Sequence, residues 1–324
     1  MSEPDAEEPS TIEAARRRWA PRIERWRRAW DRFTRHRLGI VGLAIISIYV
    51  LWALFPEVFA PHTPEWEAYL GYDAGRLTGE QRRSLPHPPA FGDPFFAPLG
   101  TDHRGRDVLT LLIYSTRNAL YIAFAAGILS SLVGVPLGLI SGYYGDTWID
   151  ETIQRVADVT YGLPFLPLVI VLIAIRGITL TNVVLAIVAK SWINNCIVIR
   201  GEVLSLKERS YVESAKVAGA SDARIVLRHL LPNVLPLSFV YLAQDAAIAI
   251  ITEASLAYLG LSDFTAHSWG IMLHDVQAQG YVFTAWWWLL PPGIAITLVA
   301  ASFYFIGFSM EDVANPQRGE NRWR

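Results

Sequence analysis

Cysteine clusters, histidine pairs and nucleotide-binding patterns are missing from this sequence. Cys196 is the only cysteine, which excludes an internal disulfide and any cysteine-based metal site and leaves packing as its expected role. The seven histidines are scattered without an H-x-x-x-H pair, and no G-x-S-x-G element is present. The pattern G-x-x-x-x-G-K-S/T, whose backbone and lysine hold nucleotide phosphates, is also missing. We therefore expect no metal and no phosphate-binding loop of this type in the chain.

A strongly basic balance is lacking as well, and the net charge of −2 gives no support for nucleic-acid binding. Apolar residues make up 52% of the chain and gather into blocks with uncharged stretches between residues 38 and 55, and between 118 and 144. A helix needs about 20 such residues to cross the hydrocarbon layer of a membrane. The blocks predict an all-α polytopic membrane protein with six transmembrane helices, at about 38–58, 116–142, 154–175, 181–199, 235–258 and 286–309.

The distribution of arginine and lysine predicts the orientation of these spans. Ten arginines lie between Arg16 and Arg37, and six basic residues lie between Arg200 and Arg228. Because basic segments stay on the cytoplasmic side, both termini are expected to be cytoplasmic. This divides the chain into a cytoplasmic tail (1–37), a first helix (38–58), an extracytoplasmic segment (59–110), a five-helix core (111–310) with a cytoplasmic loop (200–232), and a cytoplasmic tail (311–324). The Arg- and Trp-rich part of the first tail resembles an amphipathic helix that lies on an anionic leaflet.

The loop between the fourth and fifth spans has the pattern of a helical hairpin. Ser210 and Glu213 have the spacing of a capping box, which predicts a helix running to about residue 218. Gly219 supplies a left-handed turn. Ser221 or Asp222 can cap a second helix, and Pro232 is expected to end it. A stiff hairpin beside a membrane is a suitable docking element for another protein.

Ionisable residues inside the spans are the second candidate site. Lys190, Asp245 and Glu253 lie in apolar segments, where a charge costs at least roughly 2.5–3.5 kcal/mol, and Asn194 interrupts the fourth span. These four residues are candidates for a polar translocation path or a gate. The alternative is a structural network of ion pairs and hydrogen bonds, which we favour for Glu253. Gly134, Gly138 and Gly142 form a small-residue stripe suited to close helix contact, and Pro136, Pro164 and Pro167 are expected to kink their helices.

The hairpin loop resembles the EAA loop of permease subunits of binding-protein-dependent ABC importers, whose pattern is E-A-A-x3-G-x9-I-x-L-P. Ser214 stands at the first alanine of that pattern and His229 at the isoleucine. The His-x-Leu-Pro-Asn ending is usual in the peptide and nickel branch. The residues carried over are Tyr211, Glu213, Ser214, Ala215, Gly219, His229, Leu231 and Pro232.

A second element narrows the resemblance to the C-type permeases of dipeptide and oligopeptide importers. Residues 98–107 are similar to their H-P-L-G-T-D-x-x-G-R-D element, with Ala97 in place of the leading histidine. The similarity weakens at the end of the chain, where Glu311 reverses the charge of a family arginine. The residues carried over in the outer element are Gly100, Thr101, Asp102, Gly105, Arg106 and Asp107.

The resemblance implies a type I ABC importer permease fold in a prokaryotic inner membrane. It implies a homologous B-type second permease, two ABC ATPase subunits and an extracytoplasmic substrate-binding protein as partners. It also implies that the chain itself is not an enzyme and binds no cofactor, with ATP and Mg²⁺ on the ATPases. The helix at 211–219 would then sit in a groove on one ATPase.

Two alternatives come from other classes. A stand-alone secondary transporter or channel would use the intramembrane charges as an ion relay and would work without nucleotide. A membrane enzyme is the weaker alternative, since the sequence has no recognisable catalytic constellation. The substrate is not indicated, because selection in such importers rests largely with the binding protein.

Overall fold

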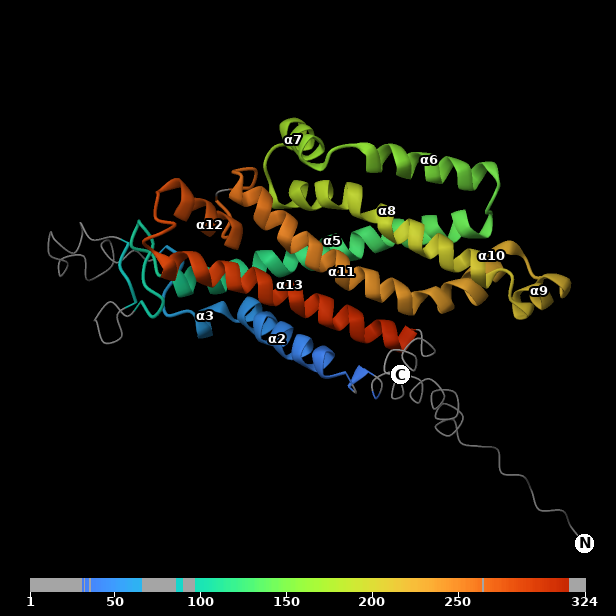
Figure 1. Ribbon diagram of the computed structural model, residues 1–324, viewed down its shortest axis with the longest axis horizontal. Helices are drawn as coiled ribbons and strands as arrows, with labels where there is room; N and C mark the ends of the chain where they lie inside the picture. The colour runs from blue at the N-terminus through green and yellow to red at the C-terminus, as the bar shows by residue number, and fades with distance from the viewer. Residues whose placement is uncertain are drawn as a thin grey trace, which may run out of the picture.

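The computed structural model describes residues 31, 33–34, 36–65, 86–89, 97–263 and 265–314. The expected amphipathic segment before Arg37, parts of the 59–110 segment and most of the C-terminal tail lie outside the described residues. Within them the structure is nearly all helical, and its helices form an elongated bundle (Figure 1). The helices are α2 (Arg37–Leu54), α3 (Pro56–Phe59), α5 (Val108–Tyr143), α6 (Trp148–Gly162), α7 (Phe165–Arg176), α8 (Leu180–Leu206), α9 (Ser210–Val217), α10 (Asp222–Ile225), the π-helix η1 (Val226–Leu230), α11 (Leu231–Tyr258), α12 (Trp269–Ala278) and α13 (Trp286–Ala314).

The expected number of membrane spans agrees with the described helices. Five of them are long and apolar enough to cross a membrane, and the bent pair α6–α7 makes a sixth crossing if it is taken as one span. The beginning of α2, the end of α13 and the short helices α9 and α10 lie at one end of the bundle, while α3 and α12 lie at the other (Figure 1). We call these the hairpin end and the α12 end.

The glycine stripe joins α5 to α8, as expected. A Cβ atom at Gly138 would lie 2.6 Å from the Cys196 carbonyl oxygen, and one at Gly142 would lie 2.6 Å from Cβ of Val203. A Cβ atom at Gly134 would collide with the Trp192 carbonyl oxygen. The backbones of the two helices therefore approach too closely for any side chain at these positions. Cys196 is buried in the same packing, in agreement with its expected role.

The third span is bent at Pro164, the first of its two prolines, whereas Pro167 lies inside α7. α6 and α7 meet at an angle of 92°. The break falls at Leu163 and Pro164, because a proline lacks the N–H that would continue the helical ladder. Pro136, by contrast, lies inside α5 without interrupting it, so that expected kink does not break the helix.

Two local predictions for the hairpin loop were wrong. Ser210 does not cap α9: the N-cap residue is Arg209, no side chain caps the helix, and Ser210 is its first helical residue. Pro232 does not end the second helix, because α10, η1 and α11 continue from Asp222 to Tyr258. Pro232 lies in the first turn of α11, where the π-helical turn before it widens the backbone and no N–H from Pro232 is required.

Candidate functional site: the hairpin end of the bundle

The α9–α10 hairpin projects from the end of the bundle between α8 and α11 (Figure 1). Its turn has the geometry that the sequence predicts, since Gly219 adopts a φ of +76°. The N–H of Ala220 donates to the Ala215 carbonyl at 3.0 Å, and the N–H of Gly219 donates to the Lys216 carbonyl at 2.9 Å. These bonds close the end of α9, so the left-handed glycine fixes the direction in which the chain enters α10.

A small apolar core fixes the hairpin to the bundle. Val212 of α9, Ile225 of α10 and Leu230 of η1 are fully buried. They pack in one cluster with Val203 of α8 and Val234 of α11. Because each of the two helices and the π turn contributes a buried side chain, the hairpin is held as part of the bundle and not as a loose loop.

The outer face of the hairpin is exposed and carries most of the family-motif residues. Glu213, Ser214, Gly219 and Pro232 are exposed, and Glu213 forms no ion pair with any described residue. Ala215, His229 and Leu231 are partly buried, and the rings of Tyr211 and His229 lie 6.5 Å apart between centroids. The structure thus places five motif residues, from Tyr211 to Gly219, on the hairpin, whereas His229 lies in η1 and Leu231 and Pro232 begin α11.

Sequence reasoning missed Val217, which is the most prominent apolar side chain of the hairpin. It is 91% exposed at the end of α9, next to the turn. The available signal was the spacing of the two valines of α9: Val212 and Val217 are five positions apart, so they cannot both point into the same core. A fully exposed valine on a rigid element offers a partner protein an apolar contact.

Two tyrosines at the end of α5 bind the beginning of α10. The hydroxyl of Tyr143 donates to Asp222 Oδ1 at 2.6 Å, and the hydroxyl of Tyr144 donates to Oδ2 at 3.2 Å. Lys216 Nζ lies 5.7 Å from the centroid of the Tyr143 ring. Asp222 stands in the first turn of α10, so these contacts tie the hairpin to the end of α5 as well as to α8 and α11.

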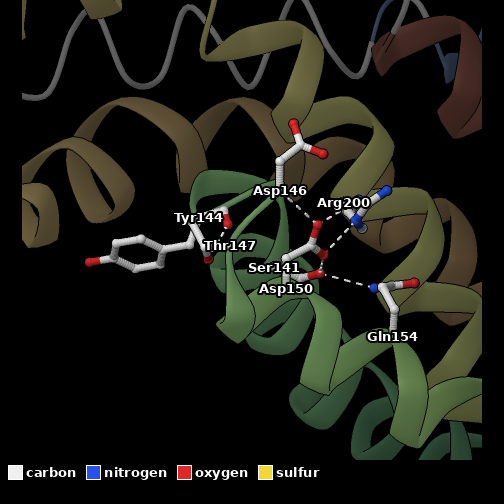
Figure 2. A network of polar contacts seen from close by, with 7 residues as sticks. All are labelled: Ser141, Tyr144, Asp146, Thr147, Asp150, Gln154 and Arg200. Atoms are coloured by element: carbon white, nitrogen blue, oxygen red, sulfur yellow. Dashed lines mark hydrogen bonds and ion pairs between the residues drawn. The ribbon is translucent and has the colours of Figure 1, made fainter.

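A polar network joins the end of α5, the first turns of α6, and α8 (Figure 2). The Arg200 guanidinium of α8 donates to both carboxylate oxygens of Asp150 in α6, at 2.7 and 2.6 Å. Ser141 of α5 donates to Asp150 Oδ1 at 2.5 Å, and Gln154 donates to the Ser141 hydroxyl at 2.9 Å. The N–H of Asp146, which has a φ of +63° in the turn between α5 and α6, donates to Asp150 Oδ2. One carboxylate therefore links α5, α6 and α8.

The intramembrane candidates do not meet at one site. Asp245 of α11 is buried and accepts a hydrogen bond from Asn195 of α8 at 2.5 Å. Glu253 of α11 is also buried. Its Oε1 accepts a hydrogen bond at 2.7 Å from the hydroxyl of Ser268. Lys190 donates to the Leu163 carbonyl at 2.8 Å, and Asn194 is exposed on α8. Hydrogen bonding thus accounts for Asp245, Glu253 and Lys190, and a part in the path stays a prediction for all four residues.

The second family element forms a compact turn at the α12 end. Gly100 and Gly105 have φ values of +77° and +80°. Asp102 is buried and accepts from the N–H of Arg106 at 2.8 Å and from its Nε at 2.7 Å.

The same turn starts α5 and reaches α12. Asp107 caps α5 by accepting from the N–H of Thr110 at 2.8 Å. Burial raises the pKa of Asp107, and the hydrogen bonds from Thr110 oppose this. Arg106 lies 3.6 Å from Asp275 of α12. Thr101 and Asp107 form an antiparallel bridge that closes the turn.

Comparison with protein families identifies the permease family that the sequence motifs resemble. Residues 134–319 match the model of the binding-protein-dependent transport system inner membrane component. Residues 24–81 match the N-terminal transmembrane domain of oligopeptide transport permease C. No cluster of three or more potential metal ligands occurs in the part of the chain that the structure describes.

Individual relatives are similar over nearly their whole length. The dipeptide transport system permease protein DppC of Alkalihalophilus pseudofirmus is 33% identical, over 91% of this chain and 91% of its own. The oligopeptide transport system permease protein OppC of Bacillus subtilis is 31% identical, over 90% of each chain. The glutathione transport system permease protein GsiD of Pectobacterium atrosepticum is 32% identical, over 90% of this chain and 91% of its own.

The fold is also found in a solved structure. An inward-facing structure of the MetNI methionine ABC transporter matches with a TM-score of 0.51 at 18% identity, covering 64% of this chain and 95% of that chain. At this identity the match concerns the fold alone, and it agrees with the type I importer permease fold expected from the sequence. The chain therefore belongs to the family of binding-protein-dependent transport system inner membrane components, as a multi-pass membrane permease subunit and not an enzyme.

Proposed function

We propose that this chain is the C-type permease subunit of an ATP-driven importer of peptides or related small solutes. A homologous second permease completes the translocation path, two ABC ATPases carrying ATP and Mg²⁺ bind at the hairpin end, and a substrate-binding protein delivers substrate at the α12 end. Relatives named as dipeptide, oligopeptide and glutathione permeases support this substrate class. In this proposal the hairpin end is cytoplasmic, as the arginine distribution predicts.

The observation that carries the proposal is the rigid, exposed α9–α10 hairpin. Its buried side is fixed by Val212 and Ile225, while Val217 and Glu213 face outward. Because one side of the hairpin is fixed to the bundle and the other is exposed, a force applied by a partner at the exposed side moves the hairpin as a rigid unit. When the ATPases close on ATP, movement of the hairpin is passed to α5, α8 and α11, which hold it.

The interaction is tested with Val217→Asp in co-expressed complexes. Because Val217 is 91% exposed, the change leaves the fold of the permease intact but places a charge in the proposed apolar contact. We expect ATPase recovery with the tagged permease in detergent to fall at least several-fold, and ATP-dependent uptake in proteoliposomes to fall with it. Leu227→Asp, also on the exposed surface but beyond the turn at 63% exposure, is the matched control. A chain that purifies alone and transports without nucleotide would instead support the stand-alone transporter.

The polar face of α6 supports a translocation path on this side of the bundle. Glu151, Arg155 and Asp158 are exposed on it. The opposite face packs on α8, where Asp150 meets Arg200 and the Leu163 carbonyl meets Lys190. α6 therefore runs beside the part of α8 between residues 190 and 200, and two of the exposed charges, Arg155 and Asp158, fall within the expected third span (154–175). Charges at that depth do not face lipid without a large cost, so this face borders water or protein.

Thiol labelling tests this assignment of α6. Cys196 is buried, so a Cys196→Ala background gives a chain in which one new cysteine reports its own surroundings. We expect Asp158→Cys to react with a charged, water-soluble maleimide at least tenfold faster than Leu132→Cys, an apolar position on α5 with 64% exposure. Protection of Asp158→Cys that is relieved by ATP would indicate a path that opens during transport. Equal, slow labelling at both positions in every state would contradict the path assignment.

A further inference from the structure

A pocket at the α12 end is not used by the coupling mechanism. It has a volume of about 180 Å³ and lies between the first turns of α5, the loop at residues 265–268 and α12. Pockets for drug-sized ligands have volumes of roughly 300–1,000 Å³, so this one fits a ligand of one or two amino-acid residues.

The inner part of the pocket holds an unused hydrogen-bonding group. Ser115 is 1% exposed, lines the pocket, and its hydroxyl has no hydrogen-bond partner among the described residues. Leu111, Ile271 and Met272 supply an apolar lining around it. A buried hydroxyl without a partner costs free energy unless a ligand or water completes its hydrogen bond. The inner wall thus suits a small group that has an apolar body and one polar atom.

The outer part of the pocket carries charges of both signs. Arg104 is exposed and forms no ion pair with a described residue. Asp275 forms a long ion pair with Arg106, with 3.6 Å between their nearest atoms. The Arg106 side chain makes a shorter contact with Asp102, at 2.7 Å from its Nε. Burial raises the pKa of Asp275, and the charge of Arg106 opposes this. Burial also lowers the pKa of His267, which favours a neutral imidazole in the wall. One cation and one weakly paired anion therefore remain for a ligand.

We infer that this pocket binds a short peptide in its zwitterionic form, with the carboxylate at Arg104, the ammonium group at Asp275 and one residue packed toward Ser115. The inference rests on the proposed function for its substrate class. It adds a peptide subsite on the permease itself, at the end of the bundle away from the hairpin. Recognition of both termini would favour short, unblocked peptides over longer or capped ones.

Binding of glycyl-leucine to the full chain in lipid nanodiscs tests the inference by titration calorimetry. We expect saturable binding that weakens at least tenfold for N-acetyl-glycyl-leucine and for glycyl-leucinamide, because each lacks one of the two terminal charges. Arg104→Gln should weaken glycyl-leucine binding at least tenfold. Arg117→Gln, an exposed arginine further along α5 that does not line the pocket, should leave it unchanged.

Ser115→Ala separates ligand binding from folding. Because the hydroxyl has no partner among the described residues, its removal should leave the melting temperature of the chain unchanged or slightly higher while weakening glycyl-leucine binding several-fold. Ser130→Ala removes another buried serine hydroxyl of α5, also without a partner in the described part of the chain but away from the pocket, and should not alter binding. No binding of glycyl-leucine, or equal binding of the capped peptides, overturns the inference. Recovery of the ATPase with the Arg104→Gln permease is measured in parallel. If the ATPase is recovered normally but neither the unmodified chain nor any variant binds peptide, the pocket assignment fails while the proposed function as an importer subunit stands.

Discussion

Gly219→Val is expected to lower ATP-dependent uptake at least tenfold. Gly219 has a φ of +76°, and apart from its two chain neighbours no described residue has an atom within 4 Å of the position that a Cβ atom would take. The effect therefore arises in the backbone and not from a collision. A left-handed conformation costs an ordinary residue roughly 1–2 kcal/mol, and a β-branched residue fits it worst. The chain relieves this strain by opening the turn, which displaces α9 from the direction in which an ATPase would meet it.

Two further variants identify the turn as the cause. Gly201→Val makes the same change at a glycine of α8 that is equally open but helical, and uptake should stay near that of the unmodified chain. Gly219→Asn should recover much of the activity, because asparagine tolerates the left-handed region. Uptake is measured in proteoliposomes containing the complete complex, together with ATPase recovery after purification. Full uptake by Gly219→Val would contradict the proposed role of the turn.

The spans and the turn of the hairpin could be predicted because both depend on local sequence. Apolar length determines a span, and glycine is the residue that tolerates a positive φ. The start of the fifth span could not be predicted in this way. Pro232 ends a helix by the local rule, yet the π turn at Val226–Leu230 carries the chain through it, and Asn233 of the next turn donates its side-chain amide to the His229 carbonyl. Tertiary packing of Leu230 and Val234 outweighs the local preference.

The hydrogen-bond and ion-pair partners of the buried polar residues were harder to predict, because they lie far away in the sequence and are brought together only by packing of the helices. Asp245 was a recognisable candidate, but its partner Asn195 lies 50 residues earlier. Asp150 was missed because it precedes the expected third span, although a signal was present. The third and fourth spans are joined by a short connection, so their far ends meet, and Asp150 and Arg200 stand at those two ends. Opposite charges placed in this way indicate an ion pair.

That ion pair gives the second large effect, in the network of Figure 2. Asp150→Asn removes the charge opposite Arg200, whose side chain is only 28% exposed, and weakens the link between α6 and α8. Loss of one partner of a buried pair costs about 3–5 kcal/mol, and we expect the lower end because Arg200 reaches some water. Arg200→Gln should be similarly destabilising. The double variant should be far less destabilised than the sum of the two, because neither charge is then left alone.

A second pair on the same helix serves as the control for this cycle. Arg155 and Glu151 are 2.8 Å apart, but both are largely exposed, so solvent screens the pair and its cycle should show little coupling. Unfolding in mixed micelles is measured for the unmodified chain and for the three variants of each cycle, which makes seven proteins. Additive effects of Asp150→Asn and Arg200→Gln would mean that the two side chains do not support one another. Strong coupling between Asp150 and Arg200, with weak coupling between Glu151 and Arg155, would mean that the buried carboxylate of Asp150 holds α6 against α8. The charges on its outer face would then be free to serve the path without holding the helix in place.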